Sequence, residues 1–419
     1  MSTIESLDAP AGTRRAPLAA LIAASAVARL GRELTVVAVP WFVLRATGSA
    51  ARTGLASTLE GLATLAAGFG AGVLVDRLGF RRAGVLGDLA CAAPLVLVPA
   101  LYRATGLAFW QLLALVFIAY LLTAPGDLAR QGLVPELAAR ARLGLARANA
   151  AVQAGPRVAA LCGPALAGAT IALLGASNAL WGGAVAFACS AALLGLLIPP
   201  AAGVARGRAA REPYLAALRD GWRFVRRQRT LRAISVTFAI TNFLDEPVSL
   251  LLLVYADRVL GGAAALGLLF AALGAGGVAG ALLFGALDRR LPRRLVFLGF
   301  PATSAVAYGL IAFTPPLAAI AVAQFAVGFS AGLVNTLNAT VVHERAPRAL
   351  LGRVAGLRSA IALAAAPLGA GATAALLGAV ELRAIFAGIA ALFMAVTAVV
   401  AATPALRDWR APAGVPGGE

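Results

Sequence analysis

The feature that most constrains this chain is a series of twelve apolar segments, each long enough for a helix to cross a lipid bilayer. A membrane-spanning helix needs about 20 apolar residues, and continuous rather than alternating apolar segments favour helices over a β-barrel. A single water-soluble core cannot absorb a chain that is 61% hydrophobic and only 13% charged. We therefore predict an all-α integral membrane protein with twelve transmembrane helices. The predicted spans are residues 18–42, 53–75, 83–102, 107–126, 151–174, 178–198, 234–256, 264–286, 295–314, 316–339, 354–378 and 383–403.

The basic residues predict which side of the membrane each loop occupies. All 36 are arginines, and 28 of them fall at the two termini or after the even-numbered spans. Because arginine-rich loops stay in the cytoplasm, both termini are predicted to be cytoplasmic, in a multi-pass protein of the bacterial inner membrane. The net charge of +18 is distributed between apolar segments, so it indicates topology rather than a nucleic-acid partner.

The arginine-rich segment 199–232 divides the chain near its midpoint. Apolar and aromatic residues recur among its arginines, which predicts an amphipathic helix at the cytoplasmic face. This segment is either a tether between two moving halves or a basic loop that merely obeys topology. The predicted organisation is an N-terminal six-helix half (1–198), this linker, a C-terminal six-helix half (233–403) and a cytoplasmic tail (404–419).

An internal repeat relates the two halves. An Asp-Arg pair and an Arg-Arg pair, three residues apart, follow the second predicted span and recur 212 residues later, after the eighth. Each copy is preceded by two glycines at the spacing that lets two helices pack closely. Two six-helix repeats are the typical organisation of a secondary transporter. The repeated residues are Gly68, Gly72, Asp76, Arg77, Arg81 and Arg82 in the first copy, and Gly276, Gly280, Asp288, Arg289, Arg293 and Arg294 in the second.

The stretch Gly72-Val-Leu-Val-Asp76-Arg77-Leu-Gly79-Phe-Arg81-Arg82 resembles the loop 2–3 signature of the major facilitator superfamily. The resemblance implies a fold of two six-helix halves related by a pseudo-two-fold axis. It also implies that this signature and its second copy form a conformational gate, whose contacts exist in only one arrangement of the halves. The alternative is that the cluster anchors a loop and orients the protein. In the second copy, Phe284 and Leu291 replace the two glycines of the signature.

Other motifs resemble the drug and siderophore exporter branch of the superfamily, of the macrolide-efflux and enterobactin-exporter type. They include Thr47-Gly48-Ser49-Ala50 after the first span and the predicted loop after the fourth span, with Ala129-Arg130-Gln131 and Val134-Pro135-Glu136. The segment Gly163-Pro164-Ala-Leu-Ala-Gly168 resembles an antiporter motif of the fifth helix, with Ala159 in place of its leading glycine.

Ionisable and amide side chains within the spans are candidate functional residues, because such groups are expensive inside a bilayer. The resemblance implies that helices 1, 4, 7 and 10 line a cavity, which would place these side chains in it. The acids Glu33, Asp245 and Glu246 are predicted to carry the coupling ion, most simply a proton. Glu33 could instead form a permanent ion pair with Arg29 or Arg32, and the other two acids could belong to a polar helix end. The predicted cavity residues are Arg29, Glu33, Asn242, Asp245, Glu246, Gln324, Asn335 and Asn338.

The function that these features favour is export of amphiphilic small molecules by proton antiport and alternating access. An uptake symporter on the same fold and a non-transporting membrane sensor are the alternatives. Neither a His-rich metal motif, a GxSxG nucleophile nor a Walker sequence occurs, so we predict no catalytic residues, no metal and no cofactor. The expected partners are a small-molecule substrate, a coupling ion and the lipid bilayer, and the expected functional unit is a monomer.

Overall fold

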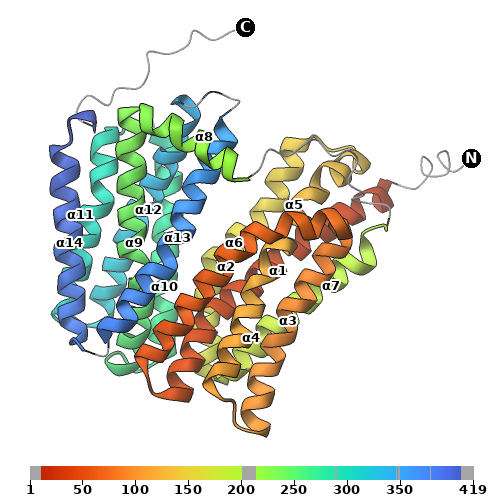
Figure 1. Cartoon of the computed structure of the whole chain (residues 1–419), viewed down its shortest axis with the longest axis horizontal. Helices are drawn as coiled ribbons and strands as arrows, with labels where there is room; N and C mark the ends of the chain where they lie inside the picture. The colour runs from red at the N-terminus through yellow and green to blue at the C-terminus, as the bar shows by residue number, and fades with distance from the viewer. Residues whose placement is uncertain are drawn as a thin grey trace, which may run out of the picture. The chain divides into compact units, whose positions relative to one another are not determined.

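The computed structural model describes residues 11–200, 214–287, 290–345, 347, 350–377 and 379–406. Within these residues every regular element is a helix (Figure 1). This follows from the sequence, because a helix satisfies all its backbone hydrogen bonds internally, as a segment in hydrocarbon must. The prediction of an all-α membrane protein is confirmed.

The chain divides into two compact units. One contains Met1–Gly48 and Leu59–Ala209, and the other contains Ser49–Thr58 and Ala210–Glu419. Ser49–Thr58, which includes the start of the second helix, therefore belongs to the second unit, although these residues lie within the predicted N-terminal half (1–198). The helices are α1 (Ala11–Thr47), α2 (Ala50–Leu78), α3 (Phe80–Ala104), α4 (Phe109–Leu121), α5 (Thr123–Arg140), α6 (Leu145–Leu174), α7 (Ala176–Leu197), α8 (Tyr214–Arg227), α9 (Arg229–Arg258), α10 (Ala263–Leu287), α11 (Arg293–Ala312), α12 (Leu317–Arg345), α13 (Leu351–Leu377) and α14 (Leu382–Ala402), followed by a 3₁₀ turn at Pro404–Leu406.

Nine of the predicted spans coincide with helices that are long and apolar enough to cross a membrane, as counted over the described residues. The other three, 18–42, 53–75 and 354–378, coincide with α1, α2 and α13. The structure corrects the fourth span, predicted as 107–126. After a break at Leu122 the chain continues as α5 to Arg140, and this helix buries a mainly apolar side together with Arg130 inside the unit.

In the second unit, α10 and α12 cross at a stripe of glycines. A Cβ atom at Gly276 or Gly280 of α10 would overlap the backbone of α12, and one at Gly328 or Gly332 of α12 would overlap the backbone of α10. Only glycine lets two helix backbones approach this closely. The small-residue spacing predicted at Gly276 and Gly280 is therefore a real helix contact. For the equivalent glycine pair in α2, the surroundings of Gly68 lie outside the described residues.

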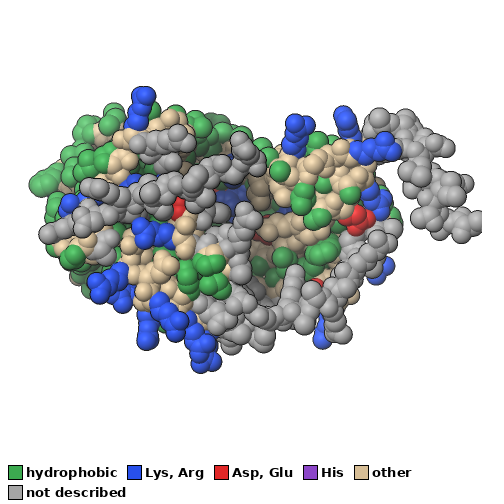
Figure 2. Space-filling view, turned by 90° about the horizontal axis from the view of Figure 1, so that it is seen from above, with side chains coloured by type: hydrophobic (Ala, Val, Ile, Leu, Met, Phe, Trp, Pro, Cys, Tyr) green, Lys and Arg blue, Asp and Glu red, His purple; other side chains and the backbone are tan. Residues whose placement is uncertain are grey.

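The amphipathic helix predicted in the linker is α8. Val225 is buried in a cluster with Ile234 of α9 and Leu406, whereas Trp222 and the neighbouring arginines are exposed. Figure 2 views this unit from the side on which α8 lies and shows arginine side chains on that face. Residues 201–213 of the predicted linker and 407–419 of the predicted tail lie outside the described residues, as do the side chains of Tyr214, Leu215 and Leu218.

Candidate functional site

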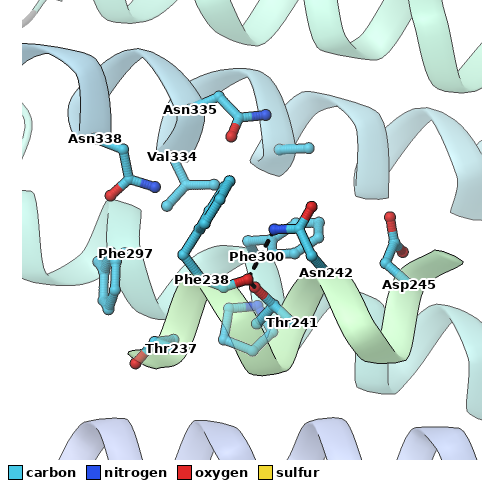
Figure 3. A pocket seen from close by; sticks show the side chains of 12 residues that line it. Thr237, Phe238, Thr241, Asn242, Asp245, Phe297, Phe300, Val334, Asn335 and Asn338 are labelled. Atoms are coloured by element: carbon cyan, nitrogen blue, oxygen red, sulfur yellow. Dashed lines mark hydrogen bonds between the residues drawn. The ribbon is translucent and has the colours of Figure 1, made fainter. Parts of the chain in front are cut away.

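A cavity lies within the second unit, between α9, α11 and α12 (Figure 3). Its volume is about 100 Å³, and it is open on one side. Four of the predicted cavity residues lie together here, two from α9 and two from α12. The lining residues are Thr237, Phe238, Thr241, Asn242, Asp245, Phe297, Phe300, Pro301, Ala331, Val334, Asn335 and Asn338.

Asp245 is the carboxylate of this cavity. The buried hydroxyl of Tyr308, on α11, donates a hydrogen bond of 2.6 Å to Asp245 Oδ1. Within the part of the chain that the structure describes, no arginine forms an ion pair with this carboxylate. Asp245 is thus fixed in place by a neutral partner, and its charge, when ionised, is left uncompensated. Tyr308 was not among the predicted cavity residues, because a single tyrosine in an apolar segment carries no distinguishing signal.

The amide side chains of the cavity differ in how their polar atoms are satisfied. Asn242 Nδ2 donates a hydrogen bond of 2.7 Å to the Phe238 carbonyl oxygen, drawn as a dashed line in Figure 3. Asn338 is 3% exposed, and its Oδ1 has no partner among the described residues. A buried amide oxygen without a partner costs free energy, so its presence needs an explanation.

Two other predicted cavity residues of this unit do not line the cavity. Gln324 is buried elsewhere on α12, with an Oε1 that lacks a partner within the described ranges. Glu246 follows Asp245 on α9, but its side chain is exposed. Consecutive residues on a helix point about 100° apart, and here only Asp245 of the two acids lines the cavity.

In the first unit, Arg29 and Glu33 lie one turn apart on α1 and form an ion pair. Arg29 Nε lies 2.6 Å from Glu33 Oε1. This contact fits the alternative prediction for Glu33, an ion pair with Arg29 rather than binding of the coupling ion. Gly163, the first residue of the antiporter-like motif on α6, packs against Glu33 of α1. A Cβ atom at Gly163 would lie 2.7 Å from Glu33 Cγ. Gly163 therefore brings α6 onto α1 at this acid, while Pro164 and the buried Gly168 lie further along α6.

A second charged cluster in this unit was missed. Arg130 was predicted in a cytoplasmic loop, but it is buried on α5, and its guanidinium donates to both oxygens of Asp88, at 2.7 and 2.8 Å. It also donates to Asp127 at 2.7 Å, and Asp127 accepts a further bond from Arg32 of α1. The hydroxyl of Ser190, on α7, completes the cluster by donating to Asp88 at 2.6 Å. Two arginines and two aspartates balance in charge, so the cluster joins α1, α3, α5 and α7 without a net buried charge.

The first copy of the gate motif lies at the junction of α2 and α3. Gly79 separates the helices with φ +76°, a conformation that favours glycine. Arg81 donates to the carbonyl oxygen of Gly195, near the end of α7, where arginine satisfies a helix C-terminus. Gly72 is half-buried on α2, and Asp76, Arg77 and Arg82 are exposed.

The second copy of the gate motif makes related contacts. Arg294 donates to the Ala401 carbonyl oxygen at the end of α14, at 3.0 Å. Arg293 forms two hydrogen bonds of 2.7 Å with Glu344, the last acid of α12, and they lower the pKa of Glu344 below its ordinary value of 4.5. This pair is therefore ionic at neutral pH. Asp288 and Arg289 lie outside the described residues.

Comparison with known proteins decides the family. A sequence model described as the Major Facilitator Superfamily matches residues 21–291 and 248–415. The chain belongs to this superfamily. Among its relatives in the superfamily is the multidrug efflux pump Tap of Mycolicibacterium fortuitum, 33% identical over 401 residues, which are 94% of this chain and 98% of that pump. The pump Tap of Mycobacterium tuberculosis is 31% identical over 94% of this chain and 95% of its own length.

Solved structures show a similar fold. The nucleoside transporter NupG matches with a TM-score of 0.75 at 11% identity, over 94% of this chain and 100% of that one. A POT family transporter in complex with 5-aminolevulinic acid matches with a TM-score of 0.68 at 11% identity, over 93% and 96%. Among the described residues of the present chain, no group of three or more His, Cys, Asp or Glu could hold a metal ion.

Proposed function

We propose that this protein exports amphiphilic, cationic small molecules from the cytoplasm in exchange for protons. The observation that carries the proposal is Asp245, a carboxylate in a cavity of a membrane protein whose relatives are named multidrug efflux pumps. The protein is accordingly a transporter of the bacterial inner membrane and not an enzyme. Its termini are cytoplasmic, as the distribution of arginines favours. It works as a monomer, because each six-helix half already supplies the partner of the other.

Asp245 supplies the exchange. A carboxylate without a cationic partner in a membrane is costly when ionised, so it favours either a bound proton or a bound cation. The two compete for the same oxygens, and release of the substrate outside therefore accompanies uptake of a proton. Tyr308 holds one oxygen of the carboxylate at 2.6 Å and leaves the other for the ligand. Glu33 and Glu246 are the alternative carriers, and the pairing of Glu33 with Arg29 makes it the weaker one.

Alternating access requires contacts that differ between the two end states. We assign this role to the two copies of the gate motif, whose arginines at the start of α3 and of α11 bind the carbonyl ends of α7 and α14 within their own units. Such hydrogen bonds form at helix termini and break without disturbing a helix interior. In this proposal the segment 199–232 is the tether between the halves.

Accumulation of a fluorescent cationic dye in efflux-deficient cells tests the function. Cells that express the protein are expected to hold several-fold less dye than cells with the empty vector, and a protonophore should abolish the difference. The Asp245→Asn variant, whose amide cannot exchange a proton, is expected to match the empty vector at equal expression. Increased accumulation would instead show uptake, and equal accumulation across a broad dye panel would favour a sensor.

A further inference from the structure

Glu60 is an acid within α2, in the first unit, that the exchange at Asp245 does not use. Its side chain is only 9% exposed, and its Oε1 is buried without a hydrogen-bond partner in the part of the chain that the structure describes. Its Oε2 is not sealed in this way. Neither oxygen forms an ion pair with a described arginine. Glu60 is therefore an uncompensated acid, with one oxygen enclosed by protein and the other accessible.

Other acids in the helices of this unit differ from Glu60, because arginines compensate them. Glu33 accepts a hydrogen bond from Arg29. Asp88 accepts hydrogen bonds from Arg130 with both of its oxygens. Such pairs can remain ionised, whereas a lone carboxylate inside a membrane is costly and takes up a proton instead. The neutral, protonated acid is therefore the favoured form of Glu60 in this conformation.

The ionisable neighbour of Glu60 is Tyr120, on α4. Tyr120 is 8% exposed, and its hydroxyl has no partner among the described residues. Of the charges that act on this hydroxyl, that of Glu60 is the strongest, and the others come from Arg32, Glu33 and Cys91. No charged group acts on Glu60 itself. A phenol can donate a hydrogen bond to a carboxylate, so Tyr120 is placed to stabilise Glu60 after its proton has left.

We propose that Glu60 is a second proton site, so that two protons enter for each cation that leaves, one at Asp245 and one at Glu60. The proposal rests on the proposed function and specifies its stoichiometry. Glu60 takes up its proton outside and releases it inside, and each unit thereby carries one proton. Exchange of two protons for one monovalent cation moves one net positive charge inward. The membrane potential, negative inside, therefore drives export, whereas a one-for-one exchange would not respond to it.

The response of transport to membrane potential tests this stoichiometry. Strongly buffered liposomes hold the purified protein and equal concentrations of a monovalent quaternary ammonium dye inside and outside, and valinomycin with a potassium gradient sets the potential. For the wild type, about 60 mV, negative inside, should make the outer dye concentration about tenfold higher than the inner one. Glu60→Gln, whose amide cannot exchange a proton, should give no dye gradient. Glu381→Gln changes an exposed acid of the second unit and should behave like the wild type.

A Glu60→Gln variant that still builds the dye gradient would overturn the proposal. If this variant does not fold, infrared spectroscopy of the purified Asp245→Asn protein gives an independent test. The C=O stretch of a protonated carboxyl group is expected there at neutral pH, and its absence would contradict the proposal. A wild type that exchanges dye for protons but ignores the potential would remove only the second proton site, whereas a wild type that exchanges no protons for dye would remove the proposed function.

Discussion

Replacement of Arg130 by methionine is expected to lower the free energy of unfolding of the first unit by about 3–5 kcal/mol, the usual effect of breaking a buried ion pair. Asp88, whose side chain is 2% exposed, would lose both hydrogen bonds that its oxygens accept from the arginine. Total stabilities are about 5–15 kcal/mol, so this loss is a large fraction of the whole and should lower the melting temperature markedly. Thermal unfolding in detergent, together with the yield of monodisperse protein, measures the effect.

The same helix offers a matched control. Arg140→Met breaks the ion pair between Arg140 and Glu136, whose side chains are 40% and 35% exposed, respectively. This substitution should change the free energy of unfolding by less than about 1 kcal/mol. Adding Asp88→Asn to Arg130→Met should recover part of the loss, because the remaining Asp127 still binds Arg32. If Arg130→Met and Arg140→Met melt at the same temperature, the charged cluster does not stabilise the unit.

The second large expected effect on the free energy of unfolding concerns the glycines at which α10 and α12 pack closely. A Cβ at Gly280 would overlap the Phe329 carbonyl oxygen, a backbone atom that cannot turn away as a side chain can. Gly280→Ala must therefore push the two helices apart, and we expect a loss of about 3 kcal/mol, the upper part of the usual range for overpacking. Thermal unfolding of the purified variant measures this loss.

Gly285→Ala is the control for this prediction. Gly285 lies on the same helix and is exposed, and a Cβ there would meet nothing within 4 Å. Alanine should be neutral or stabilising at this position, because it favours a helix over glycine by up to about 1 kcal/mol. A Gly280→Ala variant as stable as Gly285→Ala would show that the helices do not depend on their close approach.

Much of the fold could be predicted from hydropathy, because a bilayer imposes both the length and the helical state of each crossing segment. The same constraint identified Asn242, Asp245, Asn335 and Asn338 as unusual polar residues, and these four line one cavity. The glycine pair of α10 could be predicted because its spacing has a direct geometric meaning.

The parts that were missed depend on contacts between residues distant in sequence. Arg130 and Asp88 are 42 residues apart, and Ser190 and Asp88 are 102 apart. No local pattern identifies such partners, and an arginine near the end of an apolar segment resembles a loop residue. Tyr308 was missed for the same reason, since its role depends on Asp245, 63 residues away on another helix.

Proton movement in reconstituted liposomes tests the central claim, the exchange of a proton for a cation at Asp245, most directly. Liposomes loaded with a quaternary ammonium dye, which cannot carry protons itself, are diluted into dye-free buffer, and the lumenal pH is followed. For the wild type we predict that dye leaves and the lumen acidifies, whereas Asp245→Asn and protein-free liposomes show no acidification. Dye release with no acidification, or equal acidification with Asp245→Asn, would contradict the account.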